Sequence, residues 1–575
     1  MVDGSIARSA VTVRTGASLV GRGVVGAITA QAGSTVAPGR VVPFSTLSVA
    51  GNVTFAQGST YEVNINPAGL SDHLLVGGSA TLQGGAVSAL SGSGLYLPGL
   101  RYNLIATQGG ISGTFAQLST TTDLAFLTPL LSYDASNVYL AFAQTVMPVP
   151  PPPPTTPGTP SVPRTRLAPN VTPVMAPVSF ASVALTHNQA ATAAAVQTLG
   201  LGNAVYNAVL NQSVSGARQA FDALSGEVRA SAVTAGFEDS RLPREAILDR
   251  LSQPLDTPFL GVTSTMMGAY AADLPSGKGR ALAPVEVTMV RPNLFGLWGQ
   301  GFGDWGRTGS DHNAAKLTRA TGGFIIGADA GQQFFGGNWH FGLAGGYTDD
   351  SLKVSGRASS GNYQTIFGAL YGAANYGAVD LKAGTVIAST DTHTSRSIAF
   401  PLFSDQASAH NGGTAAQAFG EAGYHIPVAV LPGLAADLEP VLQGALIHLD
   451  QDRSVETSLS RAGLIGASKG YGLATTTFGL RGEYRLAALP GWTLQSMVGW
   501  RHAFGDVTPT VTQSFAGTFS SFTVSGVPVD RNALTTQASL DYALDERLTV
   551  GLSYSGQFGH RASDNAFKGN IALKF

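Results

Sequence analysis

The chain has 575 residues, a formal net charge of −2 and only 12% charged residues, about half the share of an ordinary soluble protein. Glycine fills 72 positions, and no apolar run reaches the length of about 18 residues that a transmembrane helix needs, which excludes a membrane protein built of helices. The near-neutral charge gives no reason to expect a nucleic-acid partner, and the lack of cysteine excludes disulfides, thiolate metal sites and cysteine nucleophiles.

The first residues, MVDGSIARSAVTVRTG, lack the basic and then apolar pattern of a secretory signal, because Asp3, Arg8 and Arg14 interrupt any apolar core. For an exported protein this start would indicate a fragment or a misassigned first residue. A long chain without cysteine suits a protein that crosses an oxidising compartment unfolded, where a free thiol could trap it.

Residues 1–146 are rich in valine, threonine, serine and glycine and contain a loose repeat. Its copies are VRTGASL (13–19), AQAGSTV (30–36) and FAQGSTY (55–61). The corner glycines Gly16, Gly33 and Gly58 lie 17 and 25 residues apart, which predicts the rungs of a parallel β-solenoid. A β-sandwich with repeated turns is the alternative. The later segments LYLPGLRYNLI and PLLSYDASNVYLAFA predict closing strands and a cap.

A proline-rich linker is expected over residues 147–178. Nine of the sixteen residues from 148 to 163 are proline. Such a run adopts polyproline II, which neither pairs as a strand nor continues a helix. The pattern is typical of a stiff spacer, and a ligand for an SH3-type domain is the alternative function.

Residues 179–292 are predicted to be a helical and linker segment that includes a pore helix. Alanine-rich stretches occur between residues 187 and 212. Apolar residues then recur at helical spacing at Ala217, Phe221, Leu224 and Val228. Ser240, which precedes RLPRE, is predicted to be the N-cap of a helix that ends near residue 251 and whose charges indicate wet surroundings.

Residues 293–575 alternate strictly between apolar and polar side chains, which predicts strands with one apolar face. We count about twelve candidate strands. Short turns alternate with long polar segments at 304–318, 391–413, 451–470 and 505–531. Short turns at one end and long loops at the other describe an antiparallel outer-membrane β-barrel with an even number of strands and both termini in the periplasm. The fold class is therefore mainly β, with solenoid, linkers and barrel in chain order.

The polar strand faces of such a barrel line a wet lumen. We expect Arg481, Glu483, Arg485 and Asp541 to face it, together with Asp380 and Lys382. Aromatic residues near strand ends are candidates for the girdles at the two membrane interfaces, and ordinary packing is the alternative for each of them. They are Trp298, Trp339, Tyr424, Trp492 and Trp500.

The chain resembles the type Va autotransporters over nearly all of its length. The barrel blocks that carry the resemblance are LWGQGFGDWGRTGS (297–310), TGGFIIGADAG (321–331), LAGGYTDDSLKVSGRASSGNY (343–363), DTHTSRSIAFPLFSD (391–405), GWRHAFGDVTPT (499–510) and GLSYSGQFG (551–559). ALSGEVRASA (223–232) is similar to the helical linker before the family's barrel, and residues 52–85 are similar to the end of its β-helical passenger. The resemblance implies a barrel threaded by a helix that carries a passenger to the surface of a Gram-negative cell by type V secretion.

Two features depart from the family pattern. Some members cut the passenger free at an Asn-Asn pair inside the pore, and this chain has no such dipeptide. The passenger is therefore expected to stay attached or to be cut by another protease. The family's terminal assembly signal implies roles for Ile571, Leu573 and Phe575, but Asn570 stands where the family has a glycine.

The sequence shows no catalytic constellation, cofactor motif or metal-ligand cluster. GASKG (466–470) matches G-x-S-x-G, but a nucleophile elbow needs a strand before it and a helix after it, and this segment lies between two predicted strands. We therefore expect no enzyme activity, no cofactor and no metal site from these residues.

The leading hypothesis is an outer-membrane translocator that delivers or displays its own N-terminal passenger at the cell surface. Its expected partners are outer-membrane lipid, the barrel-assembly machinery and periplasmic chaperones, and the barrel is expected to be monomeric. The alternatives are a surface adhesin built on the solenoid, or an enzyme such as an esterase or protease whose active passenger lies upstream.

Overall fold

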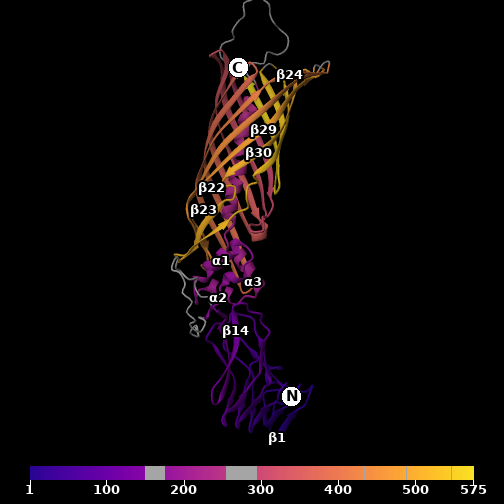
Figure 1. The fold of residues 1–575 in the computed structure, drawn as a ribbon, viewed down its shortest axis with the longest axis vertical. Coiled ribbons are helices and arrows are strands. Elements are labelled where there is room, and N and C mark those ends of the chain that lie inside the picture. The colour runs from indigo at the N-terminus through magenta and orange to yellow at the C-terminus, as the bar shows by residue number, and fades with distance from the viewer. Residues whose placement is uncertain (149–174, 254–293, 432–433, 487, 546) are drawn as a thin grey trace, which may run out of the picture.

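The computed structural model describes residues 1–148, 175–253, 294–431, 434–486, 488–545 and 547–575. An N-terminal stack of strands, a group of helices and a C-terminal barrel follow one another along the longest axis, so the chain ends lie at opposite ends of the molecule (Figure 1). Within these ranges no helix combines the length and the apolar character needed to cross a membrane.

The N-terminal part is a parallel β-helix, as the repeat predicts. Its strands are β1 (Ser5–Val13), β2 (Ser18–Val20), β3 (Val24–Ala30), β4 (Thr35–Ala37), β5 (Thr46–Val49), β6 (Val53–Phe55), β7 (Thr60–Ile65), β8 (His73–Val76), β9 (Ala80–Gln83), β10 (Ala86–Ser91), β11 (Arg101–Thr107), β12 (Ile111–Thr114) and β13 (Gln117–Thr120). Three rows of parallel pairs run along it, β3-β5-β8-β11, β3-β6-β9-β12 and β2-β4-β7-β10-β13. The parallel pairing excludes the sandwich alternative for this part.

The repeat places like residues above one another in successive rungs. Val36, Tyr61 and Val87 are aligned partners, and all three are fully buried. The corner glycines also stack, because the Gly33 amide donates to the Gly58 carbonyl at 2.8 Å and Gly16 donates to Gly33 at 2.9 Å. All three glycines have φ between 71° and 78°, a conformation that costs other residues energy.

A β-hairpin closes the stack. β14 (Leu127–Tyr133) pairs antiparallel with β15 (Asn137–Gln144), and β15 pairs antiparallel with β11. The change from parallel to antiparallel pairing ends the row of rungs, which confirms the predicted closing strands and cap.

Most of the predicted proline-rich linker lies outside the described residues. Its two described ends pair with each other, as β16 (Val146–Pro148) lies antiparallel to β17 (Met175–Pro177). The chain therefore returns to the place where it left the cap.

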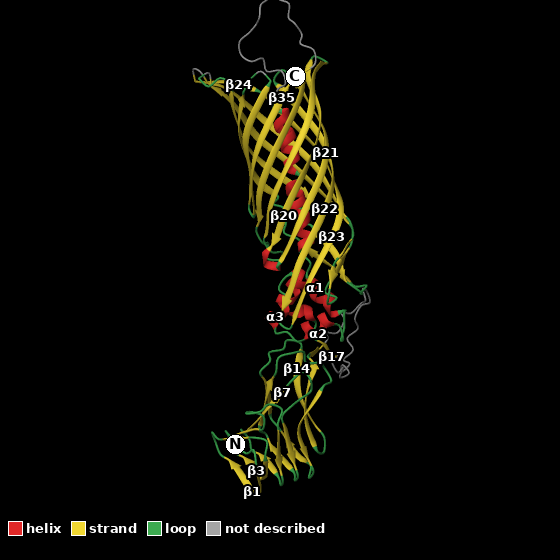
Figure 2. Cartoon of the chain, turned by 180° about the vertical axis from the view of Figure 1, so that it is seen from behind, coloured by secondary structure: helices red, strands yellow, loops and turns green. Residues whose placement is uncertain are grey.

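Five helices follow, α1 (His187–Gln197), α2 (Ala204–Leu210), α3 (Val214–Leu224), α4 (Val228–Asp239) and α5 (Arg241–Leu251), after a 3-10 turn, η1 (Phe180–Val183). The helical repeat that the sequence extends from Ala217 to Val228 is interrupted in the structure. Ser225 caps α3 and Gly226 takes a φ of 64°, so Val228 begins a new helix. The break lets α4 leave the group formed by α1 to α3 and enter the barrel (Figure 2).

The C-terminal part is a closed antiparallel barrel of twelve strands, as predicted. The strands are β18 (Leu294–Thr308), β19 (Leu317–Phe334), β20 (Gly337–Val354), β21 (Ser359–Tyr376), β22 (Val379–Phe400), β23 (Phe403–Tyr424), β25 (Leu434–Gln451), β29 (Lys469–Leu486), β30 (Trp492–Gly505), β33 (Asn532–Ala543), β34 (Leu548–Gly559) and β35 (Ala562–Lys574). Pairing between β35 and β18 closes the ring, and β24 (Ile426–Leu431) adds a short ladder to β25.

Side chains alternate across the barrel wall. β22 is buried and exposed in almost perfect alternation, and large apolar residues such as Ile387 and Leu552 are more than 70% exposed on the outer face. An exposed apolar band on a closed barrel is the surface that a membrane would cover.

Three of the four predicted long loops differ from expectation. Residues 391–413 continue β22 and β23 and turn only at Pro401 and Leu402, so they form a long hairpin. Segments 451–470 and 505–531 form a small sheet of β26 (Ser454–Val455), β28 (Leu464–Gly466), β31 (Thr510–Phe515) and β32 (Ser521–Ser525). Their serine, threonine and glycine content suggested loops, but pairing with neighbouring segments orders them as strands.

Candidate functional site

The two barrel openings differ, and we name them for what lies there. The terminal mouth is the end at which β18 begins and β35 ends, and the helical mouth is the end beside α1 to α3 (Figures 1 and 2). α4 and α5 occupy the lumen between the two mouths (Figure 2). Every residue of α4 is buried. The lumen filled by these helices is the candidate functional site.

Small residues let α4 approach the wall. The helix contains alanine, serine and Gly236, and a Cβ atom at Gly236 would lie 3.1 Å from the Tyr363 hydroxyl. A larger side chain there would push the helix away from β21. Alanine favours helix formation, and its small side chain also keeps the helix narrow enough to fit inside the pore.

Ser240 stands at the N-cap position of α5, as predicted, but its side chain makes no capping hydrogen bond. Its backbone is helical, and its hydroxyl donates to the Phe237 carbonyl at 2.7 Å. α4 thus passes almost directly into α5. Pro243 is tolerated because it lies in the first turn of α5, where backbone N–H groups have no partner within their own helix.

Ion pairs, two of them buried, join α5 to the barrel wall. Arg250 of α5 donates two hydrogen bonds to Asp329 of β19, at 2.7 and 2.8 Å. Arg241 donates to Asp304 of β18 at 2.7 Å, and Lys568 of β35 reaches Glu245 at 2.7 Å. The sequence indicated wet surroundings for the charges of α5, but Arg250 is buried and paired.

Little space remains beside the helices. A void of about 30 Å³ lies between α5 and the wall near Trp298, and another of about 40 Å³ lies between α4 and the wall near Tyr363. Each has room for a few water molecules at most. The helices therefore fill the middle of the barrel, and we call α4 and α5 the plug.

The four predicted lumen residues all lie on the inner side of the wall. Arg481 is buried and donates to Glu421 at 2.8 and 2.9 Å and to Glu439 at 2.7 Å. Asp541 is buried and accepts from Asn570 at 3.1 Å. Glu483 and Arg485 form a 2.5 Å ion pair at the terminal mouth.

Glu421 is a central residue of this network that the sequence reasoning did not single out. It also accepts from Lys382 Nζ at 2.7 Å, so two cations share its carboxylate. The period-two alternation of β23 was the signal that could have placed it in the lumen.

We expect Arg250→Ala to lower the free energy of unfolding by about 3 kcal/mol or more, because it leaves the Asp329 carboxylate buried without its main cation. The measurement is the temperature at which the purified chain in detergent loses its heat-modifiable gel migration. Arg485→Ala is the control, since that side chain is 46% exposed and its pair is worth about 1 kcal/mol or less. Equal effects of the two variants would contradict the role of the Arg250 pair.

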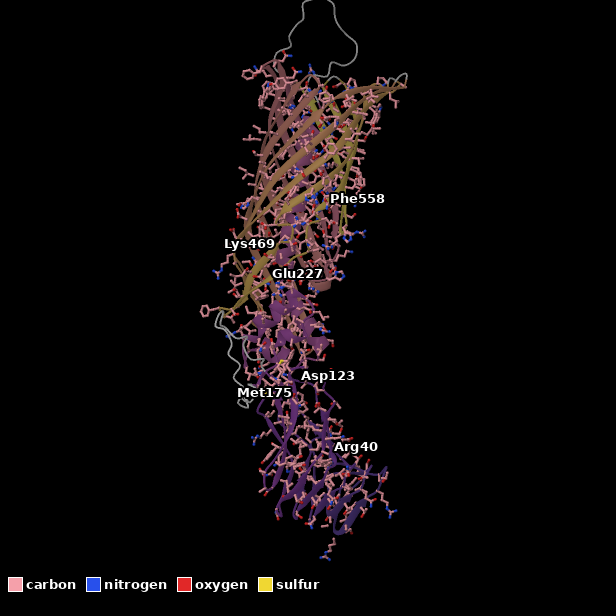
Figure 3. All side chains as sticks on the ribbon, viewed as in Figure 1. Arg40, Asp123, Met175, Glu227, Lys469 and Phe558 are labelled. Carbon is pink, nitrogen blue, oxygen red and sulfur yellow. The ribbon has the colours of Figure 1, made fainter. Side chains whose placement is uncertain are left out.

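Glu227 ties the helices to the helical mouth. Its carboxylate accepts from the Ala315 amide at 2.6 Å and from Arg357 at 3.0 Å, which lie in the connections next to β19 and β20. Burial raises the pKa of Glu227, while the guanidinium of Arg357 opposes that shift. Figure 3 labels Glu227 at this junction between barrel and helices.

The last strand presents the three residues of the proposed assembly signal to the outside. Ile571 and Phe575 are 52% and 61% exposed, and Leu573 is half-buried between its partners Leu548 and Leu297. The Phe575 amide donates to the Phe295 carbonyl at 2.8 Å. These residues therefore lie on the apolar face, at the seam where the ring closes.

Of the five candidate girdle residues, Trp298 belongs to the packing inside the barrel and not to a girdle. Trp298 is 6% exposed, faces the lumen and donates to the Tyr371 hydroxyl at 2.7 Å. Its neighbour Leu297, 51% exposed, takes the outer face instead. Tyr424, Trp492 and Trp500 are exposed, and Trp339 is half-buried.

GASKG lies between β28 and β29, so a strand and not a helix follows its serine. Gly466 instead leaves room for Arg229 of α4, because a Cβ atom there would overlap the guanidinium. The segment packs against the plug and does not form a nucleophile elbow.

Comparison with known proteins gives matches to one family and to two secreted enzymes. Residues 297–555 match the family model described as autotransporter beta-domain. An extracellular serine protease of Serratia marcescens is 26% identical over 611 residues, covering the whole chain and 53% of the relative. A second protein of that name and organism is 25% identical and covers 92% of the chain. The chain thus spans about half the length of the curated relatives it matches.

The solved structures that the chain matches share little sequence with it. The translocator domain of the autotransporter NalP from Neisseria meningitidis has 15% identity and a TM-score of 0.41, and it covers 60% of this chain and 99% of its own. The β-domain of the Bordetella autotransporter BrkA has 17% identity and a TM-score of 0.36, covering 48% of this chain and 98% of its own.

Proposed function

We propose that this chain, whose residues 297–555 form an autotransporter β-domain, is an outer-membrane translocator that delivers its own N-terminal passenger to the cell surface. The observation that carries the proposal is the path of the chain. The β-helix lies beyond the helical mouth, while the C-terminus lies at the terminal mouth, and α4 and α5 connect the two sides through the lumen (Figure 1).

The barrel suits this task for a physical reason. In lipid, every backbone N–H and C=O group must be paired within the protein, which only helices and closed barrels achieve. The ladder from β18 round to β35 meets that need without the long apolar segment that would stop export at the inner membrane. The barrel thus resides in the outer membrane, with residues 1–146 outside the cell.

The partners of assembly are part of the proposal. Before closure, β18 and β35 each have an unpaired edge, and such edges recruit other strands. We assign that capture to the barrel-assembly machinery, with periplasmic chaperones protecting the unfolded chain, and outer-membrane lipid as the final environment of a monomeric barrel.

The proposal predicts surface display. The chain, given a secretory signal and an epitope tag before Ser5, should expose the tag to antibody on intact cells. A matched chain that ends at residue 292 lacks the barrel and should keep the tag in the periplasm. The proposal would be contradicted if the antibody reached the tag of the full chain only after the cells were permeabilised, as it does for the chain that ends at residue 292.

A second candidate is that the translocator serves a passenger with peptidase activity. It is favoured by the name of the two curated relatives, extracellular serine protease. The sequence offers none of the catalytic motifs considered above, and we place the peptidase in passenger residues outside this sequence. A serine, histidine and aspartate set in the upstream reading frame would support this candidate, and an upstream β-solenoid without one would favour an adhesin.

A further inference from the structure

A large cavity lies at the terminal mouth of the barrel. It has a volume of about 610 Å³ and lies between the end of α5, at Leu251 and Ser252, and the ends of β19 to β22, β24, β25, β29 and β30. Charged side chains from several strands line it. Because α5 ends here, this part of the lumen is not filled by the plug.

Three potential metal ligands meet in this cavity. They are Asp380 of β22, His425 between β23 and β24, and Glu439 of β25, and each offers a ligand atom within 4.8 Å of the other two. Asp380 and Glu439 are buried, and His425 is half-buried. The three residues come from neighbouring strands, so one ion could reach all of them after small side-chain movements.

Glu439 carries an unsatisfied oxygen. The residue is 4% exposed, and its Oε2 accepts from Arg481 at 2.7 Å, but its Oε1 has no hydrogen-bond partner among the described residues. A buried carboxylate oxygen without a partner is costly. A bound cation would remove that cost.

His425 is oriented as a metal ligand usually is. Its Nδ1 lies 3.1 Å from Asp437 Oδ2. A carboxylate that accepts from one ring nitrogen fixes the tautomer and leaves the lone pair of the other nitrogen, Nε2, available for a metal ion. Asp437 would therefore position His425, not bind the ion itself.

The local charges favour a divalent cation. Five carboxylates lie at or next to the cavity, namely Asp380, Glu421, Asp437, Glu439 and Glu483. They face three cations, namely Lys382, Arg481 and Arg485. With His425 neutral, the cluster has a net charge of about −2, which one divalent ion would balance.

We propose that Asp380, His425 and Glu439 form a binding site for a zinc-class divalent metal ion at the terminal mouth. One imidazole nitrogen with two carboxylate oxygens is a donor set suited to zinc and similar transition metals, whereas calcium and magnesium prefer oxygen ligands alone. The open side of the site faces the cavity, so water would complete the coordination. The ion would tie β22, the start of β24 and β25 together.

The test is metal uptake by the untagged full chain, refolded in detergent and stripped of metal. Equilibrium dialysis against zinc chloride, followed by elemental analysis, should find one zinc ion per chain. Asp380→Asn and His425→Ala should each weaken zinc binding about tenfold or more. Both variants should keep heat-modifiable migration, and either one, if folded, suffices for the test.

His448→Ala is the matched control, because His448 also lies beside a carboxylate, Asp450 at 3.3 Å, but outside the cavity. It should bind zinc as the unchanged chain does. The site is overturned if the unchanged chain takes up no zinc, or if folded Asp380→Asn and His425→Ala chains bind it undiminished. Magnesium or calcium binding as tight as that of zinc would overturn the assignment of metal class.

Discussion

Removing Phe575 is expected to reduce the protein in the outer membrane severely, while the purified, refolded barrel keeps nearly its full stability. Phe575 lies beyond the end of β35, and all thirteen residue pairs between β35 and β18 persist without it. Its side chain is 61% exposed, so its loss removes at most about 2 kcal/mol of burial. A large loss in cells would therefore reflect recognition during assembly and not the stability of the closed barrel.

Phe567→Ala is the control for that experiment. Phe567 is an aromatic residue on the same strand and the same outer face, 58% exposed, where it contacts Trp305 and Tyr554. It should leave outer-membrane levels close to normal. Membrane fractions and the midpoint of heat modification would be measured for both variants. Small and equal losses for the two variants would show that Phe575 is only structural.

Deleting residues 228–251 is expected to raise the single-channel conductance of the protein in planar bilayers severalfold. The deletion removes α4 and α5, which are packed against the middle of the barrel wall with voids of about 30 and 40 Å³ beside them. Without the helices, an extended segment would pass through the pore, and the charged wall around Asp304, Asp329 and Lys568 would be hydrated. Ions could then follow that polar wall.

A chain lacking residues 1–146 is the control for the deletion. It loses a β-helix of larger mass but keeps both plug helices, so its conductance should equal that of the full chain. An equal rise in both variants would show that the β-helix blocks the pore. An unchanged conductance in the helix deletion would show that α4 and α5 do not limit the current.

The features that the sequence predicted are local ones. Alternation along a strand gives each residue its face, because successive side chains point to opposite sides of a sheet. Arg481 and Asp541 could therefore be placed in the lumen from their neighbours alone. The corners at Gly16, Gly33 and Gly58 could likewise be predicted from the sequence. Each corner needs a residue that adopts a positive φ within its own rung.

Where the alternation of apolar and polar residues was weak, predictions from the sequence were wrong. Leu297 and Trp298 are adjacent and both apolar, so neither the face nor the girdle role of Trp298 could be read from pattern. The hairpin at 391–413 looked like a loop because it is polar on both sides, yet β22 and β23 stay paired there. Ser240 occupies the predicted N-cap position but makes no side-chain capping bond, because α4 passes through it directly into α5.

Only the tertiary structure decided which charges meet. Arg319 pairs with both Asp239 of the plug and Asp564 of the last strand, and these residues come together only when the helix enters the lumen and β35 closes on β18. Asp380 and Glu439 lie far apart in the chain but on strands separated by only β23. A strand's pattern specifies the side of the wall on which a charge lies, whereas the register and closure of the ring select its partner.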